Sequence, residues 1–297
     1  MKENGSMTNL FPVDRTVAMR GIAIFLIILS HIIGLFQIRY ATPLGGTGVA
    51  IFLILSGYGL RESFSKKGLL GFWKNKFLNV YIPYFIVELL LLGEGEDFNI
   101  LSLLLLRPSV SYFWYLNFLL LNYWIFFILY SRAWHRYDNY ILLIISCLIF
   151  FYCGELRAEQ CLSFPLGVFL SKYKYRVYRY INKYTIICCL LIGFLALFIK
   201  QFDWCRAHNI LFVFVQILNK LPLALSIMFM FLFVKKNVFW NCLGKYSYEL
   251  YLTHILFIPM LIVNTSLSII PIYIILFILS ALFIYKIKVY VISLLKK

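Results

Sequence analysis

The chain has 297 residues, of which 63% are hydrophobic and only 13% are charged. Soluble domains are closer to half apolar and a quarter charged, so this composition excludes an ordinary soluble domain and indicates a polytopic membrane protein. The formal net charge of +16 would suggest nucleic-acid binding in a soluble protein. Here the basic residues lie in short segments between apolar runs, so we expect no nucleic-acid partner. The seven cysteines lack a C-x-x-C spacing, and we expect neither a metal site nor a disulfide framework.

Apolar runs long enough to cross a membrane follow one another along the whole chain. A crossing helix needs about 20 apolar residues, with a range of about 17 to 25. The sequence therefore predicts an all-α bundle of about ten transmembrane helices, formed as one domain over 1–297. The sixth run is short, and its Pro165 and Gly167 predict a broken or tilted element. The predicted spans cover residues 17–36, 46–62, 77–93, 112–131, 139–153, 160–171, 184–200, 209–234, 247–263 and 268–290.

The charged residues indicate how the chain is oriented. With the N-terminus inside, most of the 28 lysines and arginines fall in inside segments, above all 61–76, 172–183 and the tail from Lys286. Loops rich in lysine and arginine stay on the cytoplasmic side, beside anionic membrane lipid. We therefore expect both termini in the cytoplasm. The outside segments hold the basic residues Arg39, Arg107, Arg157, Lys200 and Arg206, and the acidic residues Glu94, Glu96, Asp97, Glu155, Glu159 and Asp203.

The first span carries two ionisable residues on one helical face. Arg20 and His31 have ten residues between them. This spacing is about 1100° of helical rotation, so the two lie within about 20° of one face and about 16 Å apart along the axis. We expect Arg20 near the cytoplasmic surface and His31 in the outer half of the membrane, both pointing into the bundle. Ionisable groups inside a membrane usually mark a function, although Arg20 could simply snorkel to the headgroups and His31 could hydrogen-bond a neighbouring helix.

Four further ionisable residues lie in later spans. Glu88 in the third span and Lys220 in the eighth are expected to form a structural ion pair, because an isolated charge inside a membrane is costly. Glu249 and His254 in the ninth span are five positions apart, or about 140° around the helix, so they do not share a face. His254 could be a second acid or base, or a hydrogen-bonded packing residue.

Six segments occur in a characteristic order. The first is Arg20 and His31 with ten residues between them, and the last is "LGKYSYELYLTH" at 243–254. The four between them are "IFLILSGYGL" at 51–60, "FLNVYIPYF" at 77–85, "FWYLNFLLL" at 113–121 and "SFPLGVFL" at 163–170. Together they resemble the acyltransferase-3 family of bacterial integral membrane acyltransferases, whose hallmark is an arginine, ten residues and a histidine in the first span. The resemblance covers nearly the whole chain.

The resemblance implies transfer of an acyl group, most often acetyl, from cytoplasmic acyl-CoA to a sugar hydroxyl. The acceptor would be a surface polysaccharide or its lipid-linked precursor at the bacterial inner membrane. Acyl-CoA would be the donor substrate, with no permanently bound cofactor. An alcohol needs a base to become a nucleophile, and histidine suits that task near neutral pH, so His31 is the candidate general base. Arg20 is too distant for the same atom and is expected to contact the pantetheine or phosphates of the donor, or to order the first helix.

One donor-binding position departs from the family pattern. The family often carries Arg-x-x-Arg before the third-span proline, where this chain has Lys76 and Asn79. Lysine lacks the bidentate fork of arginine, so at this position the donor phosphates would meet a point charge. Arg61 and Lys74 are candidate substitutes in the loop before this position, although the bias of basic residues toward the cytoplasm also explains them.

The candidates for the acceptor site or its cavity are Ser56, Trp114, Glu249 and His254. Trp114 could stack on a sugar, or it could belong to the aromatic belt at the membrane interface. A function of another class stays open, namely a non-catalytic transporter or flippase of a lipid-linked saccharide. It would also need intramembrane charge and an aromatic cavity. Inverted repeats would favour it, and none is evident in the sequence.

Overall fold

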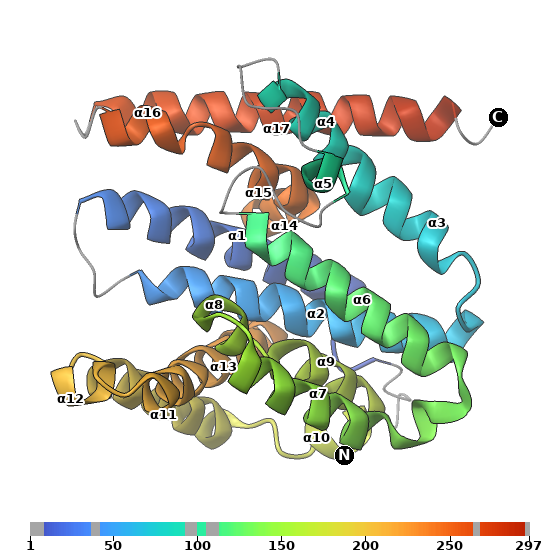
Figure 1. Ribbon diagram of the computed structural model, residues 1–297, viewed down its shortest axis with the longest axis vertical. Coiled ribbons are helices and arrows are strands. Elements are labelled where there is room, and N and C mark those ends of the chain that lie inside the picture. The colour runs from blue at the N-terminus through green and yellow to red at the C-terminus, as the bar shows by residue number, and fades with distance from the viewer. Residues whose placement is uncertain (1–8, 37–41, 93–99, 105–112, 264–267, 295–297) are drawn as a thin grey trace. The chain divides into compact units, whose positions relative to one another are not determined.

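The computed structural model describes residues 9–36, 42–92, 100–104, 113–263 and 268–294, which form helices joined by turns, with no strand among them. The all-α expectation is confirmed for these residues (Figure 1). The helices are α1 Val13–Leu35, α2 Pro43–Lys67, α3 Phe72–Lys76, a π-helical turn Phe77–Tyr81, α4 Ile82–Leu92, α5 Ile100–Leu103, α6 Trp114–Ser131, a 3-10 turn Ala133–Tyr137, α7 Asp138–Tyr152, α8 Glu155–Ala158, α9 Ser163–Lys172, α10 Lys174–Tyr178, α11 Lys183–Ile199, α12 Asp203–Arg206, α13 Asn209–Phe233, α14 Val238–Lys245, α15 Ser247–Leu256, α16 Ile258–Val263 and α17 Ile269–Leu294.

Five of the described helices are long and apolar enough to cross a membrane: α1, α2, α6, α13 and α17. Each predicted span coincides with a helix, but the expected count of ten spans is not confirmed. The helices α7, α9 and α11 have only 15, 10 and 17 residues. Two other predicted spans are divided, because 77–93 holds a π-helical turn followed by α4, and 247–263 holds both α15 and α16.

Prolines explain where these two predicted spans divide. Pro83 is the second residue of α4, and its ring would clash in a regular α-helix with the carbonyl of Asn79, four residues earlier. The chain at Asn79 runs as a π-helical turn instead. Pro259 is likewise the second residue of α16. Proline has no backbone N–H to donate to the carbonyl oxygen of Ile255, four residues earlier, and α15 ends at Leu256, next to this point.

The chain divides into two compact units. Unit 1 comprises residues 1–27, 43–68 and 133–245, and unit 2 comprises residues 28–42, 69–132 and 246–297. The boundary falls within α1, so Arg20 belongs to unit 1 and His31 to unit 2.

In unit 1, α2 packs closely along α9 (Figure 1). A Cβ atom at Gly57 would overlap the carbonyl oxygen of Phe164, and one at Gly167 would overlap the carbonyl oxygen of Ile54. Two helix backbones can approach this closely only where neither carries a side chain at the crossing point. The short element predicted at 160–171 is therefore the helix α9, and its glycine permits the close packing on α2.

A buried ion pair in unit 1 joins Lys220 of α13 to Glu159, in the turn between α8 and α9. The two side chains are only 6% and 3% exposed. The predicted pair of Glu88 and Lys220 is wrong, because Lys220 pairs with Glu159, whereas Glu88 accepts a hydrogen bond from Tyr84 Oη at 2.7 Å. Glu159, predicted in an outside loop, is instead buried. A charge held among apolar helices needs a close partner of opposite sign, and Lys220 is that partner.

In unit 2, α15 packs against α17. Thr253 Oγ1 donates a hydrogen bond to the carbonyl oxygen of Phe277 at 3.0 Å. Tyr273 Oη donates to the carbonyl oxygen of His254 at 3.1 Å. Because both donors and both acceptors are buried, these bonds fix the position of α15 along α17.

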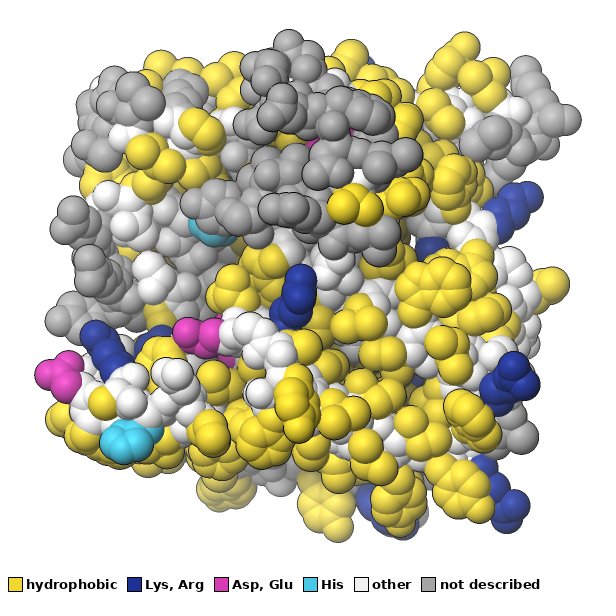
Figure 2. All heavy atoms as spheres, in the orientation of Figure 1, with side chains coloured by type: hydrophobic (Ala, Val, Ile, Leu, Met, Phe, Trp, Pro, Cys, Tyr) yellow, Lys and Arg dark blue, Asp and Glu magenta, His cyan; other side chains and the backbone are white. Residues whose placement is uncertain are grey.

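Hydrophobic side chains cover much of the face shown in Figure 2. Phe151, Leu191 and Phe283 each expose more than half of their surface. Soluble proteins rarely expose large contiguous apolar patches, whereas lipid tails would cover such a surface favourably. Together with the five long apolar helices, this surface indicates a membrane protein.

Candidate active site

The candidate site is centred on His254, near the end of α15. His254 Nδ1 lies 2.9 Å from the carbonyl oxygen of Leu250, one helical turn earlier. A carbonyl oxygen can only accept a hydrogen bond, so in the neutral ring Nδ1 carries the proton and Nε2 keeps its lone pair. The backbone of α15 thus fixes the tautomer of His254.

The other ring nitrogen of His254 has no partner of its own in the part of the chain that the structure describes, and a second histidine lies beside the ring. Nε2 is buried and has no hydrogen-bond partner within the described residues, and the side chain is 0% exposed. A buried polar atom without a partner requires an explanation, and a catalytic role is one. The ring of His31, near the end of α1, lies 5.5 Å away between ring centroids, with a tilt of 45°. His31 is half-buried, so it is the more accessible member of this histidine pair.

A buried tyrosine lies beside His254 and is itself packed against a second one. The ring centroid of Tyr251 lies 5.7 Å from that of His254. Tyr115 of α6 meets Tyr251 edge-on, with 5.3 Å between centroids. Tyr251 is not among the residues predicted for the site, although it lies three positions before His254, and residues three apart on a helix are neighbours on its surface. Trp114, which precedes Tyr115, is half-buried at the start of α6.

Glu249 does not join the histidine pair. Its carboxylate forms a buried ion pair with Lys288 of α17, which agrees with the angle predicted between Glu249 and His254 around the helix. Lys286, at which the predicted cytoplasmic tail begins, lies within α17, because this helix continues to Leu294. Lys288 therefore lies on this helix and reaches Glu249, so Glu249 holds α15 against α17.

The candidate donor-binding lysines lie on α3, in unit 2. Lys74 is exposed, whereas Lys76 is half-buried with its Nζ 4.1 Å from the centre of the Tyr123 ring. A cation–π contact of this kind positions an ammonium group without cancelling its charge. Asn79, the departure from the family pattern, donates from Nδ2 to the carbonyl oxygen of Asn75 at 3.0 Å.

The remaining candidates lie in unit 1. The expectation that Arg20 points into the bundle is wrong, because its side chain is exposed while the neighbouring Met19 fills the core. An unpaired guanidinium is costly to bury, which favours this arrangement. Ser56 is half-buried on α2. On the same helix, the guanidinium carbon Cζ of Arg61 lies 5.8 Å from the centre of the Phe64 ring. These three candidates thus belong to a different unit from the histidine pair.

The histidine pair offers an unprotonated nitrogen in apolar surroundings. A neutral imidazole in such a place is suited to accept a proton from a hydroxyl group. Among the described residues, no group of three or more histidine, cysteine or acidic side chains could hold a metal ion. The unprotonated Nε2 of His254 beside the His31 ring makes the pair a candidate for general acid–base chemistry.

A family model described as "Acyltransferase domain" matches residues 17–288. The matched range contains both members of the histidine pair and extends over both units. No curated protein and no solved structure matches the chain.

Proposed function

The chain belongs to the acyltransferase-3 family, and on that premise we propose that it is an O-acyltransferase that moves an acetyl group from cytoplasmic acetyl-CoA to a sugar hydroxyl. The acceptor we propose is a surface polysaccharide or its lipid-linked precursor. The membrane we propose is the bacterial inner membrane, with both termini in the cytoplasm. The single observation that supports a catalytic centre is the contact between His31 and His254.

The reaction begins at the acceptor hydroxyl, which is a weak nucleophile until a base removes its proton. We assign this base to His31, since it is the accessible member of the histidine pair. The hydroxyl oxygen then bonds to the thioester carbonyl carbon, and the carbon–sulfur bond breaks as the tetrahedral intermediate collapses. The proton held by His31 passes to the departing sulfur, so the products are a sugar ester and free CoA thiol.

His254 supports His31 as a positioning residue in this proposal. Its Nε2 lone pair can accept the N–H of His31, which would leave the other nitrogen of His31 directed at the hydroxyl. The same contact would stabilise the positive charge that His31 gains, as the aspartate of a Ser-His-Asp triad does for its histidine. The buried Tyr251 and Tyr115 would exclude water that could otherwise compete for the acyl group.

On the donor side, we propose that Arg20, Lys74 and Lys76 hold the phosphates of CoA, with Arg61 as a further candidate. Lysine binds a phosphate as a point charge and arginine binds it through a bidentate fork. The contact of Lys76 with the Tyr123 ring supports this role, because it positions the ammonium group before the donor arrives.

On the acceptor side, we propose Trp114 as the surface on which the sugar ring stacks. It directly precedes Tyr115, which packs against Tyr251, the tyrosine beside His254. Ser56 is a further candidate. The ion pair with Lys288 explains Glu249 without a role in binding the acceptor.

The test is acetyl transfer by membranes from cells that express the chain. These membranes should release free CoA from acetyl-CoA, and the cell's glycans should gain an acetyl-sized mass. His31→Gln keeps a hydrogen-bonding side chain but cannot accept the proton, so CoA release should fall by about 10²–10⁴-fold. The control is His208→Gln, which alters an exposed histidine whose Nδ1 also meets a carbonyl oxygen, that of Trp204, at 2.8 Å.

Near-normal CoA release by a folded His31→Gln protein would place the base elsewhere. A chain that moves lipid-linked saccharide across proteoliposomes while leaving acetyl-CoA intact would be a flippase rather than the proposed transferase.

A further inference from the structure

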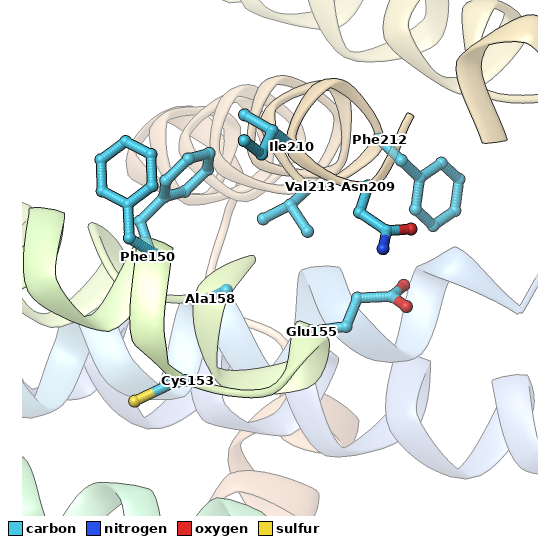
Figure 3. A pocket seen from close by; sticks show the side chains of 9 residues that line it. Phe150, Cys153, Glu155, Ala158, Asn209, Ile210, Phe212 and Val213 are labelled. Carbon is cyan, nitrogen blue, oxygen red and sulfur yellow. The ribbon is translucent and has the colours of Figure 1, made fainter. Parts of the chain in front are cut away.

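A pocket of about 350 Å³ lies in unit 1, where residues of α7, α8 and α13 face one another (Figure 3). Its volume is at the lower end of the range for small-ligand sites. None of the residues that line it takes part in the proposed acyl transfer. The pocket is therefore a second candidate binding site, and its lining defines what could occupy it.

Two polar side chains lie on facing walls of this pocket. Glu155 is the first residue of α8 and Asn209 is the first residue of α13. Figure 3 shows the carboxylate of Glu155 and the amide of Asn209 directed toward one another. A carboxylate accepts several hydrogen bonds, and an amide both donates and accepts them. Together they can bind neighbouring hydroxyl groups on one ligand.

The rest of the lining is apolar, and three of its seven residues are phenylalanines. The rings of Phe150 and Phe151 meet edge-on with 5.0 Å between centroids, and Phe212 lines the pocket from α13. Aromatic walls with a few convergent polar groups are typical of sites for small organic ligands. The flat faces can cover the C–H side of a ring whose hydroxyl groups bond to Glu155 and Asn209.

Glu155 is linked to a buried lysine, Lys200, through the side chain of Gln216. Gln216 Nε2 donates a long hydrogen bond of 3.5 Å to Glu155 Oε1, and Gln216 Oε1 accepts one from Lys200 Nζ at 3.2 Å. Lys200 follows the end of α11 and is buried. Glu159 is paired with Lys220. The formal charges of these two acids and two lysines cancel, and Arg206 beside them donates to the carbonyl oxygen of Lys200 at 3.1 Å, so no excess negative charge is left to favour a cation.

We propose that this pocket binds a neutral, hydroxyl-rich ring, namely one sugar residue of a glycan. A lipid tail would leave the Glu155 carboxylate and the Asn209 amide without partners, which costs free energy once water is displaced. A cation would meet a carboxylate whose charge is already balanced, and an anion would be repelled by it. A sugar satisfies both polar groups and covers the aromatic walls. The inference goes beyond acyl transfer, since the histidine pair belongs to the other unit.

Saturation-transfer NMR on the purified full chain tests the proposal. The detergent must lack a sugar headgroup, because a maltoside would compete for the pocket. The probes are the methyl glycosides of glucose, galactose, mannose and N-acetylglucosamine, and at least one should receive saturation. Glu155→Gln should weaken its binding about tenfold, as expected for a lost hydrogen bond to a charged group. Asn209→Ala should weaken it severalfold.

Asp203→Asn is the matched control, because it neutralises an exposed carboxylate on α12 that does not line the pocket. The Asp203→Asn protein should bind the methyl glycosides as tightly as the unaltered chain does. Saturation of no probe, or saturation that survives both Glu155→Gln and Asn209→Ala, would overturn the proposal. Glu155-dependent binding of ethanolamine in preference to every glycoside would also overturn it. Binding is measured without acetyl-CoA, so a failure of the acyl-transfer proposal would leave this result intact.

Discussion

A single backbone carbonyl determines what His254 can do. Because the Leu250 oxygen holds the ring proton at Nδ1, Nε2 is an acceptor before any substrate binds. Two neutral imidazoles can lie side by side in apolar surroundings, whereas two imidazolium ions would repel one another strongly there. The half-buried His31 can therefore take up one proton while His254 stays neutral beside it.

His254→Leu removes the ring nitrogen but keeps an apolar side chain in the same place. We expect kcat to fall about 10- to 100-fold, as for the loss of a partner that orients a functional histidine. The KM for acetyl-CoA should not change, because His254 does not touch the donor in our proposal. Steady-state CoA release measures both constants, and His208→Leu is the control. An unchanged kcat in a folded His254→Leu protein would assign the ring to packing.

The donor proposal predicts a different kinetic signature. Replacing Arg20, Lys74 and Lys76 together by glutamine should raise the KM for acetyl-CoA severalfold and weaken its dependence on salt, because exposed charge contacts are screened by ions. Lys183→Gln removes an exposed basic residue from another segment predicted to be cytoplasmic and should leave the KM unchanged. Donor kinetics that stay the same in the triple variant would mean that these charges serve membrane orientation alone.

The contact partners of a residue are harder to predict from the sequence than its position on a helix. Helical periodicity identifies the face of a helix on which a side chain lies, but not the distant helix that meets that face. His31 is thus a candidate from the sequence, while His254 stays open between a catalytic and a packing role. For the same reason the sequence pairs Lys220 with Glu88, and only the fold shows that Glu159 is its partner.

Among the secondary-structure elements, helix positions are far more predictable than helix lengths. Apolar runs bounded by charged residues mark each helix, because burial in lipid or in the core requires them. The breaks depend on local conformation, and Pro83 and Pro259 mark two of them in the sequence itself. Proline tolerates the first turn of a helix but not its middle, so each of these prolines could have divided a predicted span.

The close crossing of α2 and α9 predicts which glycines are required. Gly57→Ala and Gly167→Ala should each destabilise the protein by about 1–3 kcal/mol, the usual cost of forcing an extra methyl group into a packed contact. The measurement is the midpoint of thermal unfolding in detergent. Gly59→Ala is the control on the same helix, since a Cβ there meets nothing within 4 Å. Equal midpoints for all three variants would show that the helices separate without penalty.

For the whole molecule, the charged residues of unit 1 fit the predicted orientation. Lys174 pairs with Glu62 at 3.0 Å, and Lys172 pairs with Asp138. The acidic residues at the predicted cytoplasmic ends of α2 and α7 are thus each bonded to a lysine. Arg179, which forms no ion pair with the residues that the structure describes, adds to the basic character of this end, and basic residues favour the cytoplasmic side.

This orientation predicts the outcome of cysteine labelling with a reagent that does not cross membranes. In a background without native cysteines, Lys66→Cys and Arg179→Cys should stay unlabelled in intact spheroplasts, and Asp203→Cys should be labelled. All three positions are exposed, so each should react once the membrane is opened, which controls for access. Arg179 serves better than Lys174, whose replacement would break the pair with Glu62. Labelling of position 66 or 179 from outside would show that the predicted orientation is wrong. The basic residues proposed to hold acetyl-CoA would then lie on the side opposite to the donor's compartment.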